Sequence, residues 1–360
     1  MKTFSFGRSK ITDRGPCYVI AEIGHNHQGN LDTALKLIKV AAAMGAHAVK
    51  FQKRDNKTLF TKAMYDKPYD NENSYGLTYG EHREYLEFDM DQHITMKNCA
   101  ESHDVEFLST PFDIPSVDFL EELGVLAYKV ASGDLTNIRL LSYIAKLGKP
   151  MFISTGASTM DEIRLAYEGV SETNENVCLM HCTAGYPAEY ETLNLRTIVT
   201  LKEEFPNAII GYSGHDIGIL APSIAYMLGA TVIEKHFTLN RAWKGTDHKF
   251  SLEPTGMHKM TRDLHRIDIS LGDGLKRIQN FEYSARQKMG KSLYAARDLS
   301  AGTVLTYDDI AVKSPGDGMP PYYLDNLIGK TLLVDMGAEH PFSAEHFDSE
   351  VSEQRVANSQ

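Results

Sequence analysis

The chain has 360 residues, of which 42% are hydrophobic and 24% are charged, and its formal net charge is −11. These values predict a soluble globular protein with a sizeable core, and they argue against a surface that generally attracts nucleic acid or anionic membranes. The sequence has no apolar run near the roughly 20 residues of a membrane span, no secretory signal pattern and no CxxC pair among its four cysteines. We therefore expect a cytoplasmic protein with free thiols.

Short β-rich segments alternate with amphipathic helical segments over most of the chain. Eight strands are expected, at residues 17–23, 47–52, 106–110, 126–131, 150–155, 177–182, 208–213 and 231–236. Between them lie helical patterns such as residues 31–45, where apolar residues recur at i, i+3, i+4 and i+7. Eight strand–helix units with short links predict an α/β fold of the (β/α)8 TIM-barrel type, because eight parallel strands can close into a barrel.

An open, doubly wound sheet is the alternative architecture. It would carry a glycine-rich GxGxxG turn after its first strand, whereas this strand leads into the polar segment EIGHNHQGN. The long polar connection over residues 53–80 is expected to lie over the barrel opening as a substrate loop. A disordered decoration is the other interpretation of that connection.

The sequence pattern changes after about residue 284. The strand-like segments KSLYAARD, DDIAVKS and KTLLVDM are separated by glycine and proline turns. We predict a barrel domain over residues 1–280, a linker over 281–290, a small β-rich domain over 291–348 and a tail over 349–360.

Two lysines, Lys50 and Lys129, occur inside otherwise apolar strands, where a buried ammonium group needs an anionic partner. One interpretation is an ion pair with Glu22 or Glu234, and the other, which is compatible with it, is a bound phosphate or carboxylate. Glu22 is also a candidate proton donor or acceptor, with a pKa that should rise on burial unless a lysine adjoins it. Hydroxyl groups that would help to hold an anion follow the strand ends where the chemistry of such barrels collects: Thr110, Ser132, Ser154 and Ser213.

Two histidines follow neighbouring predicted strands, His215 in GYSGHD and His236 in IEKHF. Because the ends of adjacent strands lie close together, both imidazoles could bind one divalent metal and leave coordination positions open for catalysis. Surface histidines without a ligand are the alternative. His25 and His27, in GHNHQG, are interpreted as loop residues or as hydrogen-bonding partners of a substrate.

The segments AEIGHNHQGN, VKFQ, YGEHREYLEF, KVASGD, ISTGAST, HCTAGYP, GYSGHD and IEKHFTL with WKGTDHKFSLEP resemble, in this order, the motifs of the sialic acid synthase family. The resemblance covers about residues 15–345. That family includes N-acetylneuraminate, N-acylneuraminate-9-phosphate, legionaminate and pseudaminate synthases, and it joins a (β/α)8 barrel to a C-terminal antifreeze-like (SAF) domain. The resemblance therefore implies a SAF domain in the β-rich segment and a domain-swapped homodimer.

The resemblance also implies roles for individual residues. Lys50 and Lys129 would act in catalysis, with Glu22 near the reacting carbons. A divalent metal, Mn²⁺ with Mg²⁺ or Co²⁺ as alternatives, would bind to His215 and His236. Phosphoenolpyruvate would contact Lys50, Thr110, Lys129, Ser132, Ser154 and Ser213, and the acceptor sugar would contact Gln52, Asp134, Tyr186 and Asp247.

Three positions depart from the motifs of the family. Ala184 in CTAGYP lacks the amide that helps to hold phosphoenolpyruvate in bacterial relatives, and Asp134 in KVASGD is one methylene shorter than the usual glutamate. Ser314 in KSPG replaces an arginine expected near the N-acyl group. The segment YGEHREYLEF and the missing arginine favour the animal-type synthases, which take the 6-phosphorylated sugar, although the acceptor stays open.

We therefore expect a transferase of carbohydrate biosynthesis that condenses phosphoenolpyruvate with an N-acylmannosamine-type sugar or its 6-phosphate. The products would be a sialic-acid-type nonulosonate and phosphate, formed with the help of a metal and with C–O cleavage. A 3-deoxy-octulosonate 8-phosphate or aromatic-pathway synthase on the same barrel is one alternative, against which the SAF-like segment argues. A non-catalytic sugar-binding or ice-binding protein is another, and it leaves Lys50, Lys129 and the histidine pair without a purpose.

Overall fold

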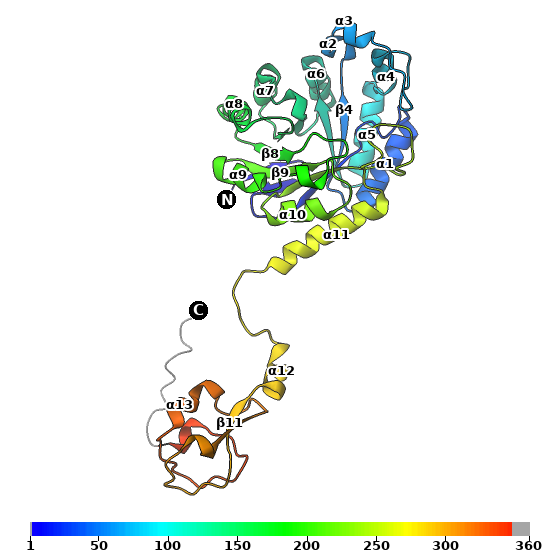
Figure 1. Ribbon diagram of the computed structural model, residues 1–360. Coiled ribbons are helices and arrows are strands. Elements are labelled where there is room, and N and C mark those ends of the chain that lie inside the picture. Colours follow the sequence, from blue (N-terminus) through cyan, green and yellow to red (C-terminus); the bar gives the residue numbers. More distant parts are fainter. Residues whose placement is uncertain (1, 348–360) are drawn as a thin grey trace. The chain divides into compact units, whose positions relative to one another are not determined.

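The computed structural model describes residues 2–347 of the chain (Figure 1). They belong to two compact units, which divide between Gly272 and Asp273, whereas the barrel domain was predicted to end at residue 280. The first unit contains the predicted barrel and the second contains the predicted small domain. The tail predicted over residues 349–360 lies outside the described residues.

Eight parallel strands form the centre of the first unit. Their order is β5-β4-β3-β10-β9-β8-β7-β6, and the two end strands also contact each other, so the sheet curls into a barrel. Each strand lies within or overlaps a segment predicted from the sequence, which confirms the predicted fold class. The strands are β3 (Tyr18–Glu22), β4 (Ala48–Lys53), β5 (Glu106–Pro111), β6 (Tyr128–Val130), β7 (Met151–Ser154), β8 (Val177–Cys182), β9 (Ile209–Gly214) and β10 (Val232–His236).

Helices surround this sheet (Figure 1). Short polar side chains cap their N-termini: Asn30 accepts a hydrogen bond from the Thr33 amide, and Thr159 and Glu162 form a capping box, which replaces the backbone partners that a helix start lacks. None of the described helices is both long and apolar enough to cross a bilayer. The helices are α1 (Leu31–Ala43), α5 (Met90–Ser102), α6 (Ile114–Leu123), α7 (Ile138–Ala145), α8 (Met160–Ser171), α9 (Thr197–Glu204), α10 (Leu220–Met227) and α11 (Pro254–Leu271).

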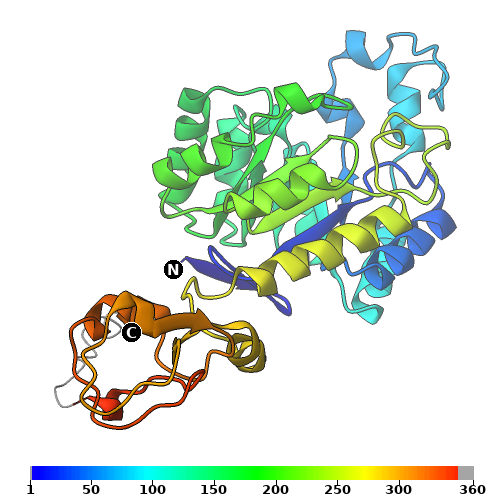
Figure 2. The same ribbon diagram turned by 60° about the horizontal axis from the view of Figure 1, so that its bottom comes forward.

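Side chains alternate along the barrel strands between two cores, as the strand period of two requires. Outward side chains such as Val49 pack in the main core with residues of the helices. Inward side chains such as Phe152 form a second core together with Phe4 from the hairpin of β1 (Thr3–Phe6) and β2 (Ser9–Thr12). This hairpin, which the sequence analysis did not predict, closes the N-terminal end of the barrel (Figure 2). The polar side chains predicted to be functional lie at the opposite, C-terminal end of the strands.

The long connection after β4 is ordered and contains three helices, α2 (Asn56–Leu59), α3 (Lys62–Tyr65) and α4 (Tyr79–Tyr85). Tyr75 donates a hydrogen bond from its hydroxyl to the Lys244 carbonyl oxygen at 2.8 Å, and the Gly245 amide donates to Asn73 Oδ1 at 2.9 Å. These bonds attach the connection to the loop that follows β10. The structure therefore supports the predicted position over the barrel rim and not a disordered decoration.

The second unit has a small core of its own, which includes Leu293, Leu305 and Phe342. Strands β11 (Ser292–Ala295) and β12 (Ile310–Lys313) pair antiparallel, within two of the three predicted strands. The third predicted strand, KTLLVDM, is wrong as a continuous strand, because its residues form only isolated bridges to three separate partners. Within the predicted linker, residues Glu282–Met289 form helix α12, and the irregular connection lies at residues 272–281. The unit also contains α13 (Leu324–Leu327) and 3-10 turns at Tyr307–Asp309, Pro321–Tyr323 and Ala344–His346.

Candidate active site

A cavity of about 590 Å³ opens at the C-terminal ends of the barrel strands, and its size is within the range of small-molecule sites. Strand register explains how it gathers polar groups. His236 on β10 pairs with Glu22 on β3, and Glu22 pairs with Lys50 on β4. Twelve of the thirteen predicted site residues line this one cavity: Glu22, Lys50, Gln52, Thr110, Lys129, Ser132, Ser154, Tyr186, Ser213, His215, His236 and Asp247.

Asp134 is the predicted site residue that does not line the cavity. It lies in the 3-10 turn after β6, and its Oδ1 accepts a hydrogen bond from Asn137 Nδ2 at 3.2 Å. Conversely, the lining includes Arg54, Arg83 and Cys182, which the sequence analysis did not single out. A signal for the arginines was present, because Arg83 lies within YGEHREYLEF and Arg54 directly follows the second barrel strand.

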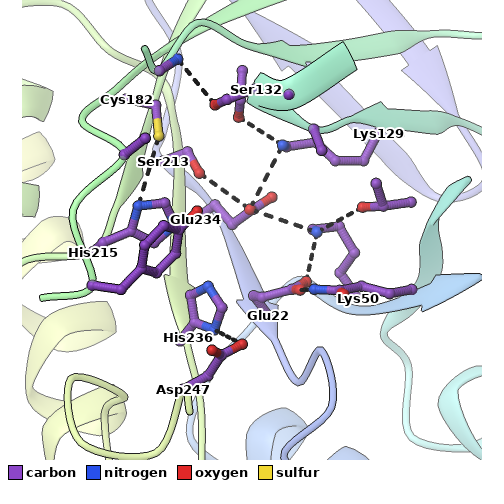
Figure 3. Close-up of a pocket in the computed structure, with 18 of the residues that line it drawn as sticks. Glu22, Lys50, Lys129, Ser132, Cys182, Ser213, His215, Glu234, His236 and Asp247 are labelled. Atoms are coloured by element: carbon purple, nitrogen blue, oxygen red, sulfur yellow. Dashed lines mark hydrogen bonds and ion pairs between the residues drawn. The ribbon is translucent and has the colours of Figure 1, made fainter. Parts of the chain in front are cut away.

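A buried ion pair holds Lys50 at the centre of the barrel (Figure 3). Its Nζ lies 2.6 Å from Glu22 Oε2 and 3.7 Å from Glu234 Oε1, and it donates a hydrogen bond to Thr110 Oγ1 at 2.9 Å. Both carboxylates proposed as partners from the sequence are therefore confirmed. Burial lowers the pKa of Lys50, but Glu22 and Glu234 outweigh burial, and the pKa lies above its ordinary value.

Lys129 is also buried, but less negative charge lies near its ammonium group than near that of Lys50. Its Nζ donates to Ser154 Oγ at 2.6 Å and to the Val130 carbonyl oxygen at 3.1 Å, but the carboxylate of Glu234 is 3.9 Å away (Figure 3). Burial lowers the pKa of Lys129 below its ordinary value, and the attraction of Glu234 offsets this only in part. An anion bound beside Lys129 would supply the compensation that this ammonium group lacks.

The two central carboxylates have opposite tendencies to hold a proton. Burial raises the pKa of Glu22 above its ordinary value in spite of Lys50, so the lysine did not cancel the rise expected on burial. Burial also raises the pKa of Glu234, but Lys129 and Lys50 outweigh it and lower the pKa. Glu22 is thus the better proton carrier of the two, and its Oε1 is held by Gln52 Nε2 at 2.7 Å.

The two predicted metal ligands lie side by side, with ring centroids 5.3 Å apart. His215 Nδ1 is 3.0 Å from the Thr183 carbonyl oxygen, a contact that orients the ring and leaves Nε2 available. His236 Nδ1 is buried, lacks a hydrogen-bond partner among the described residues and lies 3.6 Å from Asp247 Oδ2. Burial, together with His215 and Lys50, lowers the pKa of His236 well below its ordinary value, so its imidazole is neutral and able to bind a metal.

Among the described residues, these two imidazoles do not belong to a larger set of metal ligands. Within residues 2–347, no group of three or more histidine, cysteine, aspartate or glutamate side chains is arranged to hold a metal ion. Tyr186 packs its ring on His215, with centroids 4.2 Å apart, and is more than half exposed. The pair therefore offers two nitrogen ligands beside an aromatic ring at the cavity edge.

The NeuB family model matches residues 37–276, and the SAF domain model matches residues 290–348. The chain belongs to the NeuB family. It is 40% identical over 335 residues to human N-acetylneuraminate-9-phosphate synthase, a match that covers 93% of each chain. It is 35% identical over 339 residues to the N,N'-diacetyllegionaminic acid synthase of Legionella pneumophila, covering 92% of this chain and 95% of that protein.

One of two similar solved structures agrees with membership of the NeuB family, and the other shares only the fold. The N-acetylneuraminic acid synthetase of Leptospira borgpetersenii superposes with a TM-score of 0.70 and 32% identity, covering 79% of this chain and 95% of that one. A truncated 3-deoxy-D-arabino-heptulosonate 7-phosphate synthase from Thermotoga maritima superposes with a TM-score of 0.58 at 14% identity, covering 75% and 93%. The second likeness extends to the barrel fold alone. The resemblance inferred from the motifs is therefore confirmed.

Proposed function

We propose that this NeuB-family enzyme condenses phosphoenolpyruvate with an N-acylmannosamine-type sugar, giving a nonulosonate and inorganic phosphate. The observation that carries the proposal is the cavity in which two buried lysines and two neighbouring histidines meet. The relatives named above as neuraminate and legionaminate synthases support the same chemistry.

The lysine side of the cavity suits phosphoenolpyruvate. Lys129 lies 3.9 Å from the nearest oxygen of Glu234, so a phosphate or carboxylate beside it would gain charge-assisted hydrogen bonds without displacing a tight ion pair. In our proposal Lys50 and Lys129 stabilise the bound enol ester and the departing phosphate. The hydroxyl groups that would share this task are those of Thr110, Ser132, Ser154 and Ser213, all of which line the cavity.

His215 and His236 would hold a divalent metal, for which we propose Mn²⁺, with Mg²⁺ or Co²⁺ as alternatives. The residues fit such an ion, because the buried Nδ1 of His236 has no hydrogen-bond partner among the described residues and His215 is oriented by Thr183. When bound, the ion would polarise a carbonyl oxygen and lower the pKa of a water molecule. Two protein ligands alone would leave coordination positions for substrate and water.

In the proposed reaction, carbon 3 of phosphoenolpyruvate forms a bond to the aldehyde carbon of the open-chain sugar, and a proton passes to the aldehyde oxygen. A water oxygen adds at carbon 2, and the bond from carbon 2 to the phosphate oxygen breaks, leaving a ketone and inorganic phosphate. Glu22 is the proposed proton carrier, because burial raises its pKa. The proposed sugar contacts are Gln52, Tyr186 and Asp247, which line the cavity, whereas Asp134 does not.

We also propose that the enzyme acts in the cytoplasm as a domain-swapped homodimer. The support for this assembly is the SAF domain match at residues 290–348 and the family to which the chain belongs. Light scattering would test it, and the mass of a single chain would contradict it.

A phosphate-release assay with phosphoenolpyruvate and Mn²⁺ tests the reaction. The acceptors are N-acetylmannosamine, its 6-phosphate, a diacetamido trideoxy analogue and arabinose 5-phosphate. Release with an N-acylated sugar supports the proposal. Release with arabinose 5-phosphate alone would favour a 3-deoxy-octulosonate 8-phosphate type of synthase.

A further inference from the structure

Two arginines face one histidine in the same cavity. Arg54 follows β4, Arg83 lies on α4 and His25 follows β3, and all three line the cavity that contains the lysines. Arg54 Nη1 is 3.1 Å from His25 Nε2, and Arg83 Nη1 is 3.2 Å from His25 Nδ1. The two guanidinium groups therefore approach opposite nitrogens of one ring.

This arrangement leaves a hydrogen bond unmade. A neutral imidazole has one N–H and one accepting nitrogen, and an imidazolium has no acceptor at all. In either tautomer of a neutral His25, one guanidinium N–H points at another N–H group. Burial, with Arg54 and Arg83 nearby, lowers the pKa of His25 well below its ordinary value, which is consistent with a neutral ring. At least one arginine thus has a donor directed at no acceptor.

Few carboxylates lie near the two arginines to balance their positive charge. Among residues 2–347, no carboxylate lies within 4.0 Å of Arg83, whose Nε and Nη2 donate to the Tyr79 hydroxyl at 3.0 and 2.8 Å. Arg54 lies 4.0 Å from Glu87 Oε1, but Glu87 is 3.1 Å from Lys53. Lys53 and Arg54 therefore share one carboxylate, and Arg83 has none among the described residues, so the two arginines carry more positive charge than the carboxylates beside them balance.

The geometry around Arg54 is fixed before any ligand binds. Its side chain is buried, its guanidinium stacks on Phe112 with 3.7 Å to the ring centroid, and its Nη2 donates to Gln52 Oε1 at 2.7 Å. The amide nitrogen of Gln52 donates to Glu22, the proposed proton carrier. A single glutamine thus connects Arg54 to Glu22 by hydrogen bonds.

We infer that Arg54, Arg83 and His25 form a second anion subsite, which binds a phosphate group on the acceptor sugar. This rests on the proposed function, because the lysines then hold phosphoenolpyruvate and the arginines are left for the acceptor. An unphosphorylated N-acylmannosamine is neutral and would leave both guanidinium groups unbalanced. A phosphomonoester has three terminal oxygens, so it accepts hydrogen bonds from two guanidinium groups at once.

The test compares two acceptors in Arg83→Gln, because Arg83 is only half-buried and its replacement disturbs packing less than that of Arg54. With N-acetylmannosamine 6-phosphate, we expect kcat/KM to fall about 10- to 100-fold, the size of a lost hydrogen bond to a charged group. With unphosphorylated N-acetylmannosamine, we expect little change. Arg139→Gln, which replaces an exposed arginine on α7, is the matched control and should match the wild type on both acceptors.

An equal fall of kcat/KM on both acceptors, or no fall on either, would overturn the subsite. If Arg83→Gln melts at a much lower temperature than the wild type, the same comparison of acceptors is made with the variant Tyr79→Phe. That variant removes the hydroxyl that holds Arg83 and should raise KM for the phosphorylated acceptor with little effect on kcat. A change in kcat alone would contradict the inference.

Calorimetry separates the subsite from the proposed reaction. If no acceptor supports phosphate release, the proposed function fails, but binding is still measurable. Tight binding of N-acetylmannosamine 6-phosphate to the wild type, weakened in Arg83→Gln and absent for the unphosphorylated sugar, upholds the subsite. Equal affinity for both sugars, or no binding of either, overturns it.

Discussion

The two ends of the barrel carry different chemistry on the same strands. On β7, Phe152 belongs to the apolar core that closes the N-terminal end, whereas Ser154 bonds Lys129 at the opposite end. On β10, Val232 belongs to that core, and Glu234 and His236 line the cavity. Residues two apart face the same side of a strand, so one short strand supplies both an apolar core residue and a polar residue of the cavity.

Stability and function can therefore be changed separately along one strand. The ionic end gains little from its charges, because buried ion pairs lose in desolvation much of what they gain by attraction. The apolar end supplies the burial that holds the strands together. Substitutions at the N-terminal end should therefore affect unfolding, and those at the C-terminal end should affect turnover.

The largest expected effect is on turnover. His236→Ala removes one of the two proposed metal ligands. Because a bound metal contributes several kcal/mol to catalysis in such sites, phosphate release should fall about a thousandfold. The melting temperature should fall much less than in a core truncation, because the His236 ring lines the cavity and its Nδ1 has no hydrogen-bond partner among the described residues. His103→Ala, at the exposed end of α5, is the control. Undiminished release in chelated buffer would argue against the metal site.

A comparable effect, on stability, is expected at the other end. Phe152 is fully buried, with ring centroids 5.8 Å from Phe4 and 5.7 Å from Phe6. Phe152→Ala should lower the free energy of unfolding by about 3–5 kcal/mol, as measured by urea denaturation, while kcat/KM below the melting temperature stays near that of the wild type. Phe281→Ala, at an exposed position, should not change stability. A Phe152→Ala variant that is as stable as the wild type but inactive would contradict the separation of stability and turnover between the two barrel ends.

The smallest expected effect concerns pH. Burial raises the pKa of Glu22 above 4.5, so proton donation by Glu22 should be available below this raised pKa and lost as pH rises through it. Glu22→Gln should lower kcat about a hundredfold and abolish that limb of the pH–rate profile. The same shift makes the wild type less stable, relative to Glu22→Gln, as pH rises through the folded-state pKa. A profile unchanged in Glu22→Gln would exclude Glu22 as the proton carrier.

Strand periodicity and the lysines made the barrel and most of its site predictable. Lys50 and Lys129 stand out because a charge inside an apolar segment needs a partner, and the structure places both beside Glu234. The hairpin of β1 and β2 was missed because two four-residue strands carry too short a pattern to distinguish from a loop. Their role appears only when Phe4 meets Phe152 across the barrel.

The arginine subsite was missed for a different reason. Arg83 lies within the family-like segment YGEHREYLEF, but this segment forms a short helix in a long polar connection and does not itself show which strand end the arginine reaches. Helix α12 lies inside the predicted linker, and it agrees with the sequence, because residues 282–289 contain good helix formers and neither glycine nor proline. The position of Arg83, in contrast, depends on contacts that the alternation of apolar residues does not report.

The most direct test of the account follows one oxygen atom. The enzyme is incubated with phosphoenolpyruvate that carries ¹⁸O between carbon 2 and phosphorus, and with N-acetylmannosamine 6-phosphate or N-acetylmannosamine. The masses of the products are then measured by mass spectrometry. Condensation with C–O cleavage predicts that the label leaves with inorganic phosphate. Label kept in the sugar product, or phosphate formed without a new carbon–carbon bond, would contradict it.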